Sequence, residues 1–304
     1  MDDCIKAYND LARVVFKVDN SMGVFPTGKD GCRFDHQVLE QVLKDMVKTV
    51  CRDEQATMSL KSDEVFKTCP TFVIAKKRSN VDGPPTLFRS YPCREHDADE
   101  CSIWQAARAT TAAPSFFKPV RIEIPSPGGV FIDGGLIYNN PTELVIKEAK
   151  KIWTDLDYFC VVSVGTGRQR SVGGPAGIEH RGTSQTRVLE HVPGIRSLVK
   201  LPTGIKTITR IAEDCVRLAT SSESVHQSML SQSRPRNSRQ GFPYYRFNVE
   251  RDMDCINLQE WEKMEEIAES TARYLDEEEA HEKLNRCVQD LIRSPRPGRK
   301  YKFP

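Results

Sequence analysis

The segment VFIDGGLIYNNP, residues 130–141, places a carboxylate where a folded chain could use it for chemistry. Residues 130–132 are apolar and β-prone, which predicts a short buried strand. Asp133 then stands at the carboxyl end of that strand, the edge at which open α/β sheets bind their ligands. Gly134 and Gly135 allow the backbone to turn sharply or a ligand to come close. Asp133 is therefore either a base that needs a partner or a turn residue that accepts hydrogen bonds from its own backbone.

A catalytic base of this kind activates a nucleophile, and the strand-to-helix turn that exposes a serine reads Gly-x-Ser-x-Gly. Of the 18 glycines only Gly173 and Gly177 are four residues apart, and the residue midway between them is Pro175. Ser163, inside VVSVGTG, has the position of a strand residue, and Ser115 has no such turn around it. The sequence thus contains no nucleophile elbow, and we expect no nucleophile within it.

The residues that commonly bind metals or cofactors are dispersed. The ten cysteines include no CxxC pair and the six histidines have no partner at ligand spacing, so we expect reduced, mostly structural thiols and no metal site. No carboxylate cluster resembles a calcium loop. Gly165-Thr166-Gly167 could hold a phosphate at a helix N-terminus or form a plain turn. No cofactor is predicted.

The composition is that of a soluble protein. The 304 residues carry a net charge of +2, with 38% apolar and 28% charged residues and a mean hydropathy of −0.49. This balance gives no basis for nucleic-acid binding, and no apolar run reaches the roughly 20 residues of a membrane-spanning helix. The first residues, MDDCIKAYND, lack a secretory signal. We therefore expect a cytoplasmic protein and leave peripheral membrane association open.

The pattern of apolar residues predicts alternating strands and helices, which indicates an α/β sheet protein. Helices are expected at residues 2–16, 35–50, 102–113, 141–153, 203–231 and, as one helix or a pair, 257–292. Strands are expected at 71–75, 87–91, 130–132, 158–167 and 243–249. The strand at 158–167 is continuously apolar, as buried parallel strands are.

Two segments have little apolar periodicity. Residues 168–200 are rich in Gly, Ser, Arg and His and are predicted to be a mobile loop or linker. The tail RSPRPGRKYKFP, residues 293–304, holds five basic residues and no acidic one. Such a tail is either solvated or attracted to anionic lipid.

Several stretches, in this order, resemble the second half of a patatin-like phospholipase domain. They are ARATTAAPSFFKP (107–119), FIDGGLIYNNP (131–141) and VVSVGTG (161–167). MDDCIKAYNDLARVVF resembles the helix that comes soon after that family's nucleophile. PYYRFNV and the late helix resemble its C-terminal region, as seen in fungal multi-domain members.

The resemblance implies a three-layer, α/β-hydrolase-related fold with a mainly parallel central sheet. It implies hydrolysis of phospholipid or other acyl-lipid esters at a membrane surface by a Ser-Asp dyad, with Asp133 matching the proton acceptor and Gly134 and Gly135 completing its motif. The family's serine lies in Gly-x-Ser-x-Gly, after a Gly-Gly-x-Arg loop that stabilises the oxyanion. This sequence contains neither.

Two hypotheses remain. In the first, residues 1–167 are the C-terminal part of such a domain, whose nucleophile is encoded upstream; 168–200 are a linker, 201–292 a mostly helical region that packs on the domain, and 293–304 a basic tail. The chain alone would then be inactive and poorly folded, because its sheet would have unpaired edges. In the second, the chain is a non-catalytic pseudoenzyme that binds lipid or a protein.

Overall fold

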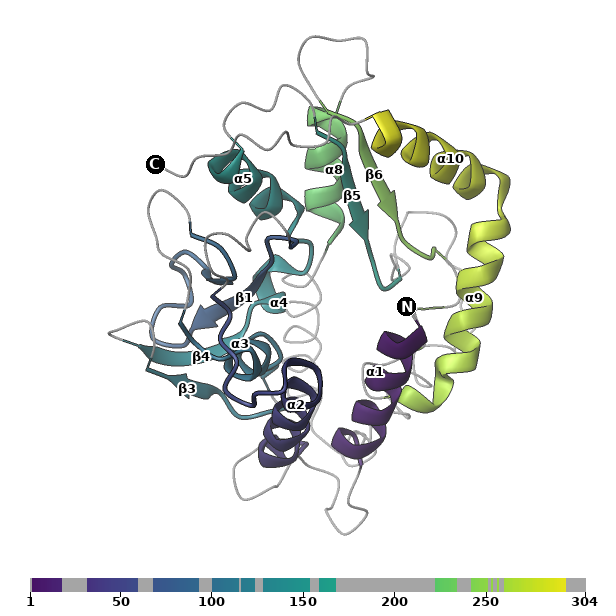
Figure 1. The fold of residues 1–304 in the computed structure, drawn as a ribbon. Coiled ribbons are helices and arrows are strands. Elements are labelled where there is room, and N and C mark those ends of the chain that lie inside the picture. The colour runs from purple at the N-terminus through teal and green to yellow at the C-terminus, as the bar shows by residue number, and fades with distance from the viewer. Residues whose placement is uncertain are drawn as a thin grey trace, which may run out of the picture. The chain divides into compact units, whose positions relative to one another are not determined.

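The structure is a computed structural model whose described residues form two compact units, one up to Asn139 and one from Asn140 onward (Figure 1). It describes residues 2–17, 32–59, 68–92, 100–114, 116–123, 128–153, 159–167, 222–233, 242–250, 253, 256 and 260–293. The predicted linker 168–200, the part 203–221 of a predicted helix, and the tail 294–304 lie outside the described residues.

The first unit contains a four-stranded sheet. Its strands are β1 (Phe72–Lys77), β2 (Thr86–Arg89), β3 (Val120–Ile122) and β4 (Gly129–Asp133), in the order β2-β1-β4-β3. Every neighbouring pair is antiparallel, and Ala75 of β1 stands opposite Asp133 of β4. The ring of Phe88 meets that of Phe131 edge to face, with 5.2 Å between their centroids, at the centre of the core.

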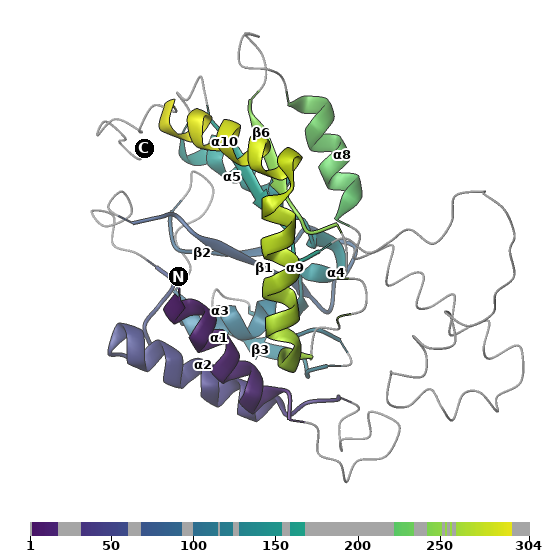
Figure 2. The same ribbon diagram turned by 90° about the vertical axis from the view of Figure 1, so that its right-hand side faces the viewer.

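Three longer helices accompany this sheet: α1 (Asp2–Val15), α2 (His36–Cys51) and α3 (Ile103–Thr110). Asp35 begins α2 as predicted, because its Oδ1 accepts a hydrogen bond of 2.8 Å from the N–H of Gln37. Arg52, in the left-handed conformation with φ 61°, ends it. α3 packs against β1, β3 and β4, and α2 packs against α3 and α1 (Figure 2). The Ala-rich face of α3 permits this close approach to the sheet.

The strand directions differ from the expectation. A mainly parallel sheet is not what the described strands form, since three of their four pairings are antiparallel. For two of these pairings the reason is the length of the connection, because β1 joins β2, and β3 joins β4, through segments too short for the crossover that parallel strands need. The strand β3 and the one-turn helix α4 (Gly135–Tyr138) were not predicted at all.

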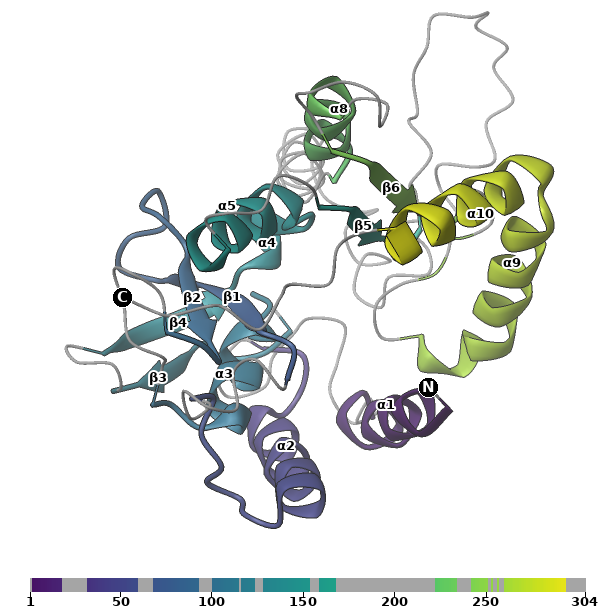
Figure 3. The ribbon, with the colours of Figure 1, turned by 45° about the horizontal axis from the view of Figure 1, so that its top comes forward.

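The second unit contains the parallel pair β5 (Val161–Val164) and β6 (Tyr244–Phe247), with Val161 opposite Tyr244. Its helices are α5 (Thr142–Ile152), α8 (Glu223–Gln232), α9 (Met264–Asp276) and α10 (Glu278–Arg293), and a 3-10 turn spans Trp261–Lys263. α8 and α10 both contact β6 (Figure 3). The predicted late helix is thus a pair, α9 and α10, and none of the described helices has the length and apolar character to cross a bilayer.

β5 is shorter and less buried than its apolar sequence predicted. Val161 and Ser163 are buried, whereas Val162 and Val164 on the other face are 41% and 77% exposed. Among the described strands β5 pairs only with β6. The alternation of buried and exposed residues is therefore that of a strand with one covered face.

Candidate functional site

Asp133 is the last residue of β4, held on both sides by the backbone. It stands opposite Ala75 of β1, and its N–H donates a hydrogen bond of 3.0 Å to the carbonyl of Ala112, just after α3. The side chain is half-buried. The sheet and the end of α3 together therefore fix the position of this carboxylate.

The two oxygens of the Asp133 carboxylate have different surroundings. Oδ1 accepts a hydrogen bond of 2.7 Å from the N–H of Gly135, which makes Asp133 the first residue of a local turn. Within the described part of the chain, no donor is hydrogen-bonded to Oδ2. One oxygen thus orients the side chain while the other remains available as an acceptor.

The pKa of Asp133 is raised above its ordinary value. Burial is the main cause, because it disfavours the charged form, and the hydrogen bond from Gly135 opposes it in part. A carboxylate with a raised pKa holds a proton more strongly than an exposed one. That property suits a general base working near neutral pH.

The glycines that follow have a steric reason. A Cβ on Gly134 would lie 2.6 Å from the carbonyl oxygen of Ile74 and 2.7 Å from its Cγ2, so a side chain there would push β1 away. A Cβ on Gly135 would lie 3.1 Å from Asp133 Oδ1. The same Ile74 carbonyl accepts a hydrogen bond of 2.7 Å from the hydroxyl of Thr110. The motif is therefore packed tightly against β1, and α4 begins directly after it.

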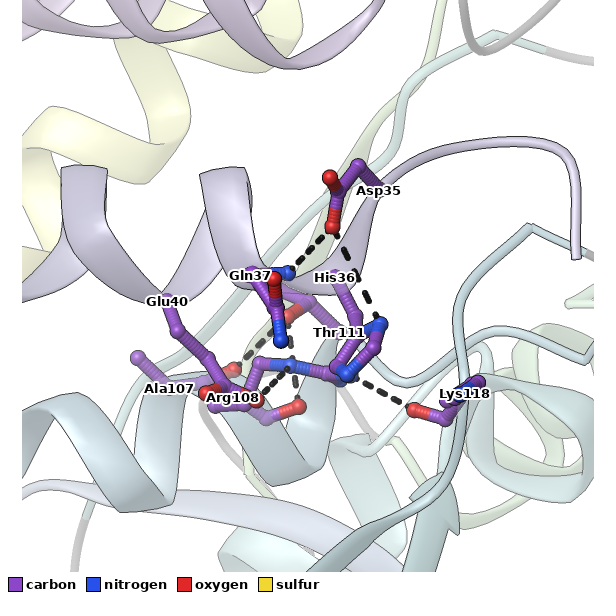
Figure 4. A network of polar contacts seen from close by, with 8 residues as sticks. All are labelled: Asp35, His36, Gln37, Glu40, Ala107, Arg108, Thr111 and Lys118. Atoms are coloured by element: carbon purple, nitrogen blue, oxygen red, sulfur yellow. Dashed lines mark hydrogen bonds and ion pairs between the residues drawn. The ribbon is translucent and has the colours of Figure 1, made fainter. Parts of the chain in front are cut away.

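Arg108 of the ARATTAAP segment is fully buried and links α3 to its neighbours (Figure 4). Its Nε lies 3.3 Å from Glu40 Oε1 of α2, and its Nη2 donates a hydrogen bond of 2.6 Å to the carbonyl of Lys118. Burial lowers the pKa of Arg108 and the Glu40 carboxylate opposes that shift. The sequence alone does not indicate this role, because an arginine in a short helix usually faces solvent.

Of the two serines considered as nucleophiles, the structure describes Ser163, whose contacts do not favour that role. Ser163 Oγ is buried and accepts a hydrogen bond of 2.7 Å from Arg246 Nη1, and it lies 3.1 Å from Thr142 Oγ1. It thus joins β5, β6 and α5 within the second unit. Ser115 lies outside the described residues.

The Gly-Thr-Gly turn after β5 uses its N–H groups internally. The N–H of Gly165 donates to the carbonyl of Phe247 at 2.8 Å, and that of Gly167 donates to Asn248 Oδ1 at 2.8 Å. These two donors are engaged, so the geometry is that of a plain turn. Among the described residues no group of three or more His, Cys, Asp or Glu side chains could hold a metal ion.

The family match and the similar proteins found by comparison agree with one another. Residues 5–146 match the patatin-like phospholipase family. Calcium-independent phospholipase A2-gamma of Homo sapiens is 30% identical over 179 residues, which cover 56% of this chain and 21% of the human protein. Phospholipase A I of Arabidopsis thaliana is 24% identical over 222 residues, or 55% of this chain and 16% of that protein.

Patatin-like protein 3 of Arabidopsis thaliana is 31% identical over 146 residues, 42% of this chain and 32% of its own length. The chain thus spans about a fifth of the length of the phospholipase A2-gamma relatives that it matches. The matched region includes the sheet, α3, Arg108 and the whole of the Asp133 motif. Residues 5–146 therefore carry a patatin-like phospholipase domain, related to calcium-independent phospholipase A2-gamma.

Proposed function

We propose that Asp133 is the proton acceptor of a Ser-Asp dyad in a lipid acyl hydrolase. The observation that carries this proposal is the divided role of its carboxylate: Oδ1 is held by the N–H of Gly135, and Oδ2 has no donor among the described residues. The raised pKa of Asp133 supports the same role, since it strengthens the carboxylate as a base.

The chemistry follows the general scheme of covalent ester hydrolysis. A serine hydroxyl gives its proton to Oδ2 of Asp133 while its oxygen attacks the ester carbonyl of the lipid. The tetrahedral adduct expels the alcohol, which takes a proton from Asp133, and leaves an acyl-serine. Water then loses a proton to the same carboxylate and attacks the acyl group. The serine oxygen leaves and takes that proton back from Asp133, which releases the fatty acid and restores the dyad. Gly135 keeps the carboxylate in one orientation throughout, because its N–H remains on Oδ1.

The nucleophile is proposed to come from a segment upstream of residues 1–304. The sequence contains no Gly-x-Ser-x-Gly and no Gly-Gly-x-Arg loop ahead of Asp133, and both are expected from the family. The complete domain would then have the three-layer, mainly parallel sheet of that family, to which the parallel pair β5–β6 would contribute. Residues 1–167 would belong to that domain and 201–292 would pack on it.

The proposed substrates are phospholipids or other acyl lipids presented by a membrane. The names of the relatives, phospholipase A2 and phospholipase A, support this substrate class. We place the protein in the cytoplasm, where it would reach such a surface as a peripheral protein.

The first experiment treats residues 1–304 with a fluorophosphonate probe and with vesicles of phosphatidylcholine. Neither labelling nor fatty-acid release is expected. The second uses a longer form, obtained by sequencing the transcript upstream of Met1 and including any in-frame Gly-x-Ser-x-Gly. That form should be labelled and should release fatty acid, and Asp133→Asn should lower its turnover by roughly 10³-fold or more.

Asp53→Asn is the matched control for this substitution. Asp53 Oδ1 also accepts a hydrogen bond from the N–H two residues on, that of Gln55 at 2.9 Å, but its side chain is exposed. Asp53→Asn should leave turnover unchanged. A transcript with no upstream elbow, or a longer form in which Asp133→Asn keeps full activity, would contradict the proposal and favour the lipid-binding pseudoenzyme.

A further inference from the structure

Two thiols of the second unit come together although their residues are far apart in the sequence. Cys160 directly precedes β5, and Cys287 lies in the middle of α10. Their side chains are hydrogen-bonded to each other. Cys287 is buried, with 2% of its surface exposed, whereas Cys160 is half-buried. Solvent therefore reaches the pair through Cys160 more readily than through Cys287.

The strand register brings the two residues together independently of that bond. Side chains alternate along a strand, so Cys160 lies on the same face of the β5–β6 pair as Val162. Val162 stands opposite Tyr245 of β6, and the hydroxyl of Tyr245 donates a hydrogen bond of 2.6 Å to Asp290 Oδ2 of α10. Cys287 is three residues before Asp290 and so lies on the same side of that helix. Helix α10 therefore lies against the strand face that carries Cys160 (Figure 3).

Both sides of this contact are anchored by packing within the second unit. The N–H of Val161, the residue after Cys160, donates a hydrogen bond of 2.9 Å to the carbonyl of Pro243, just before β6. On α10, Ala280 is buried in a cluster with Tyr274 of α9. These contacts hold the start of β5 and the body of α10 in place, so the two sulfur atoms are kept together.

We propose that Cys160 and Cys287 form a disulfide when the chain meets an oxidant that is itself a disulfide, such as oxidised glutathione. The Cys160 sulfur, the more accessible of the two, loses its proton and attacks one sulfur of the oxidant. This gives a mixed disulfide and releases one glutathione, which takes up the proton. The Cys287 sulfur then loses its proton and attacks the Cys160 sulfur, and the second glutathione leaves as a thiol. The chain has lost two hydrogen atoms, the oxidant has gained them, and the new bond joins β5 to α10.

The surroundings of the pair make this disulfide slow to form and slow to break. Burial raises the pKa of both thiols, and the nearby Asp290 carboxylate raises it further, so little of either thiol is ionised. Formation is slow because the attacking group in the exchange is the thiolate. Reduction is slow because the same groups must then leave as thiolates, and a thiol of high pKa leaves poorly. The disulfide is therefore a durable link and not a rapidly exchanging one.

The test is a long incubation of residues 1–304 with oxidised glutathione at about pH 8, followed by blocking of free thiols and non-reducing digestion. Mass spectrometry should find the peptides of Cys160 and Cys287 joined, with a mass lower by two hydrogen atoms than that of the separate peptides. The same incubation in concentrated urea is the control. Random pairing among ten cysteines joins Cys160 to Cys287 in about one molecule in nine, whereas in buffer this link should be the main intramolecular product.

Cys160→Ala and Cys287→Ala should each remove this link. Cys69→Ala, which replaces an exposed thiol, is the matched control and should leave the link unchanged. The link closes a loop of about 130 residues, so oxidation should raise the melting temperature of the unchanged chain by about 5–15 °C, and Cys287→Ala should show no such shift. Reduced glutathione should break the link at least about tenfold more slowly than it removes glutathione from Cys69, because the leaving thiol of the link has a raised pKa.

Pairing in buffer that is as random as in urea, or a main link between other cysteines, would overturn the inference. So would a mixed disulfide on Cys160 that is never resolved by Cys287, or a pair that stays reduced when the exposed thiols have been oxidised. The result is independent of the proposed function, because both thiols lie outside the matched residues 5–146 and take no part in the proposed hydrolysis.

Discussion

Arg108 Nε and Glu40 Oε1 are 3.3 Å apart, and the arginine of this pair has no exposed side-chain surface while the glutamate is 27% exposed. The pair joins α3, which lies on the sheet that carries Asp133, to α2. A buried guanidinium without a counter-charge is costly, and the Nη1 of Arg108 already has no hydrogen-bond partner among the residues that the structure describes.

Glu40→Ala should therefore destabilise the first unit by about 3 kcal/mol, measured as a lower midpoint in urea. Glu123→Ala is the control, because its partner Arg121 and Glu123 itself are both more than half exposed, at 68% and 64%. That change should cost ~0–1 kcal/mol. Equal effects of the two substitutions would show that the buried pair contributes no more than a surface pair.

Gly134→Ala should be poorly tolerated. The added methyl group would lie 2.6 Å from the Ile74 carbonyl oxygen, and a backbone atom of a central strand cannot move aside cheaply. We expect a loss of about 1–3 kcal/mol in unfolding free energy, as for other overpacked sites.

Gly129→Ala, at the first residue of β4, is the matched control for Gly134→Ala, which lies just after the last residue of that strand. Its methyl group would meet Lys77 and Phe131 side-chain atoms at 3.5 Å, which is ordinary contact. Thermal unfolding of both variants separates the effect of the close approach from that of losing a glycine. If Gly129→Ala were the more damaging change, the packing of Gly134 on β1 would not be the determining feature.

Asp133→Asn should change stability in a pH-dependent way. The pKa of Asp133 is raised in the folded chain above the ordinary value of 3.8, so ionisation costs the folded state more than the unfolded state. The stability linked to this group is present below the ordinary pKa and is lost as the pH rises through the raised one. Asparagine has no such loss and can still accept the Gly135 N–H.

The melting temperatures of the unchanged chain and of the Asp133→Asn variant should thus be similar at about pH 4. As the pH rises to 7, the melting temperature of the variant should increase relative to that of the unchanged chain. An asparagine form that is less stable at pH 7 than at pH 4, relative to the original chain, would mean that the negative charge of Asp133 is favourable in the fold.

Cys160 and Cys287 should resist alkylation. Burial, together with the neighbouring Cys287 and Asp290, raises the pKa of Cys160 to about 12, and burial also raises the pKa of Cys287. Since the thiolate is the reactive form, iodoacetamide at pH 8 should modify Cys160 at least a hundredfold more slowly than an ordinary exposed thiol, by roughly the drop in thiolate fraction, and should also modify Cys287 more slowly than such a thiol. Mass spectrometry of peptides measures the rates, with exposed Cys51 and Cys69 as internal controls.

Helices with clear local signals were well predicted from the sequence. Asp35 before a periodic apolar run marked the start of α2, and residues 257–292 were recognised as one helix or a pair. Strand positions were also found where apolar, β-branched residues are bounded by Gly or Pro, as for β1 and β4. These signals are local, so they can be seen without knowing what packs against them.

Strand direction and close packing could not be seen in the same way. An apolar run is the same whether its neighbour is parallel or antiparallel, and β3 has only three residues. At the site, Gly134 and Gly135 indicate a turn after Asp133. The contact of Gly134 with Ile74 is not visible in the sequence, because it depends on a strand about 60 residues earlier. The burial of Arg108 likewise depends on Glu40 of another helix.

The turn at Asp133 has a consequence for how relatives of this chain can be compared. The bond from the Gly135 N–H requires only an acceptor oxygen at position 133, and the amide of asparagine provides one. A lineage released from catalysis could therefore replace the acid by its amide in one step and keep the fold. Under the proposed function, the reaction needs an acid at position 133, whereas Gly134 is needed only for the packing of the turn on β1.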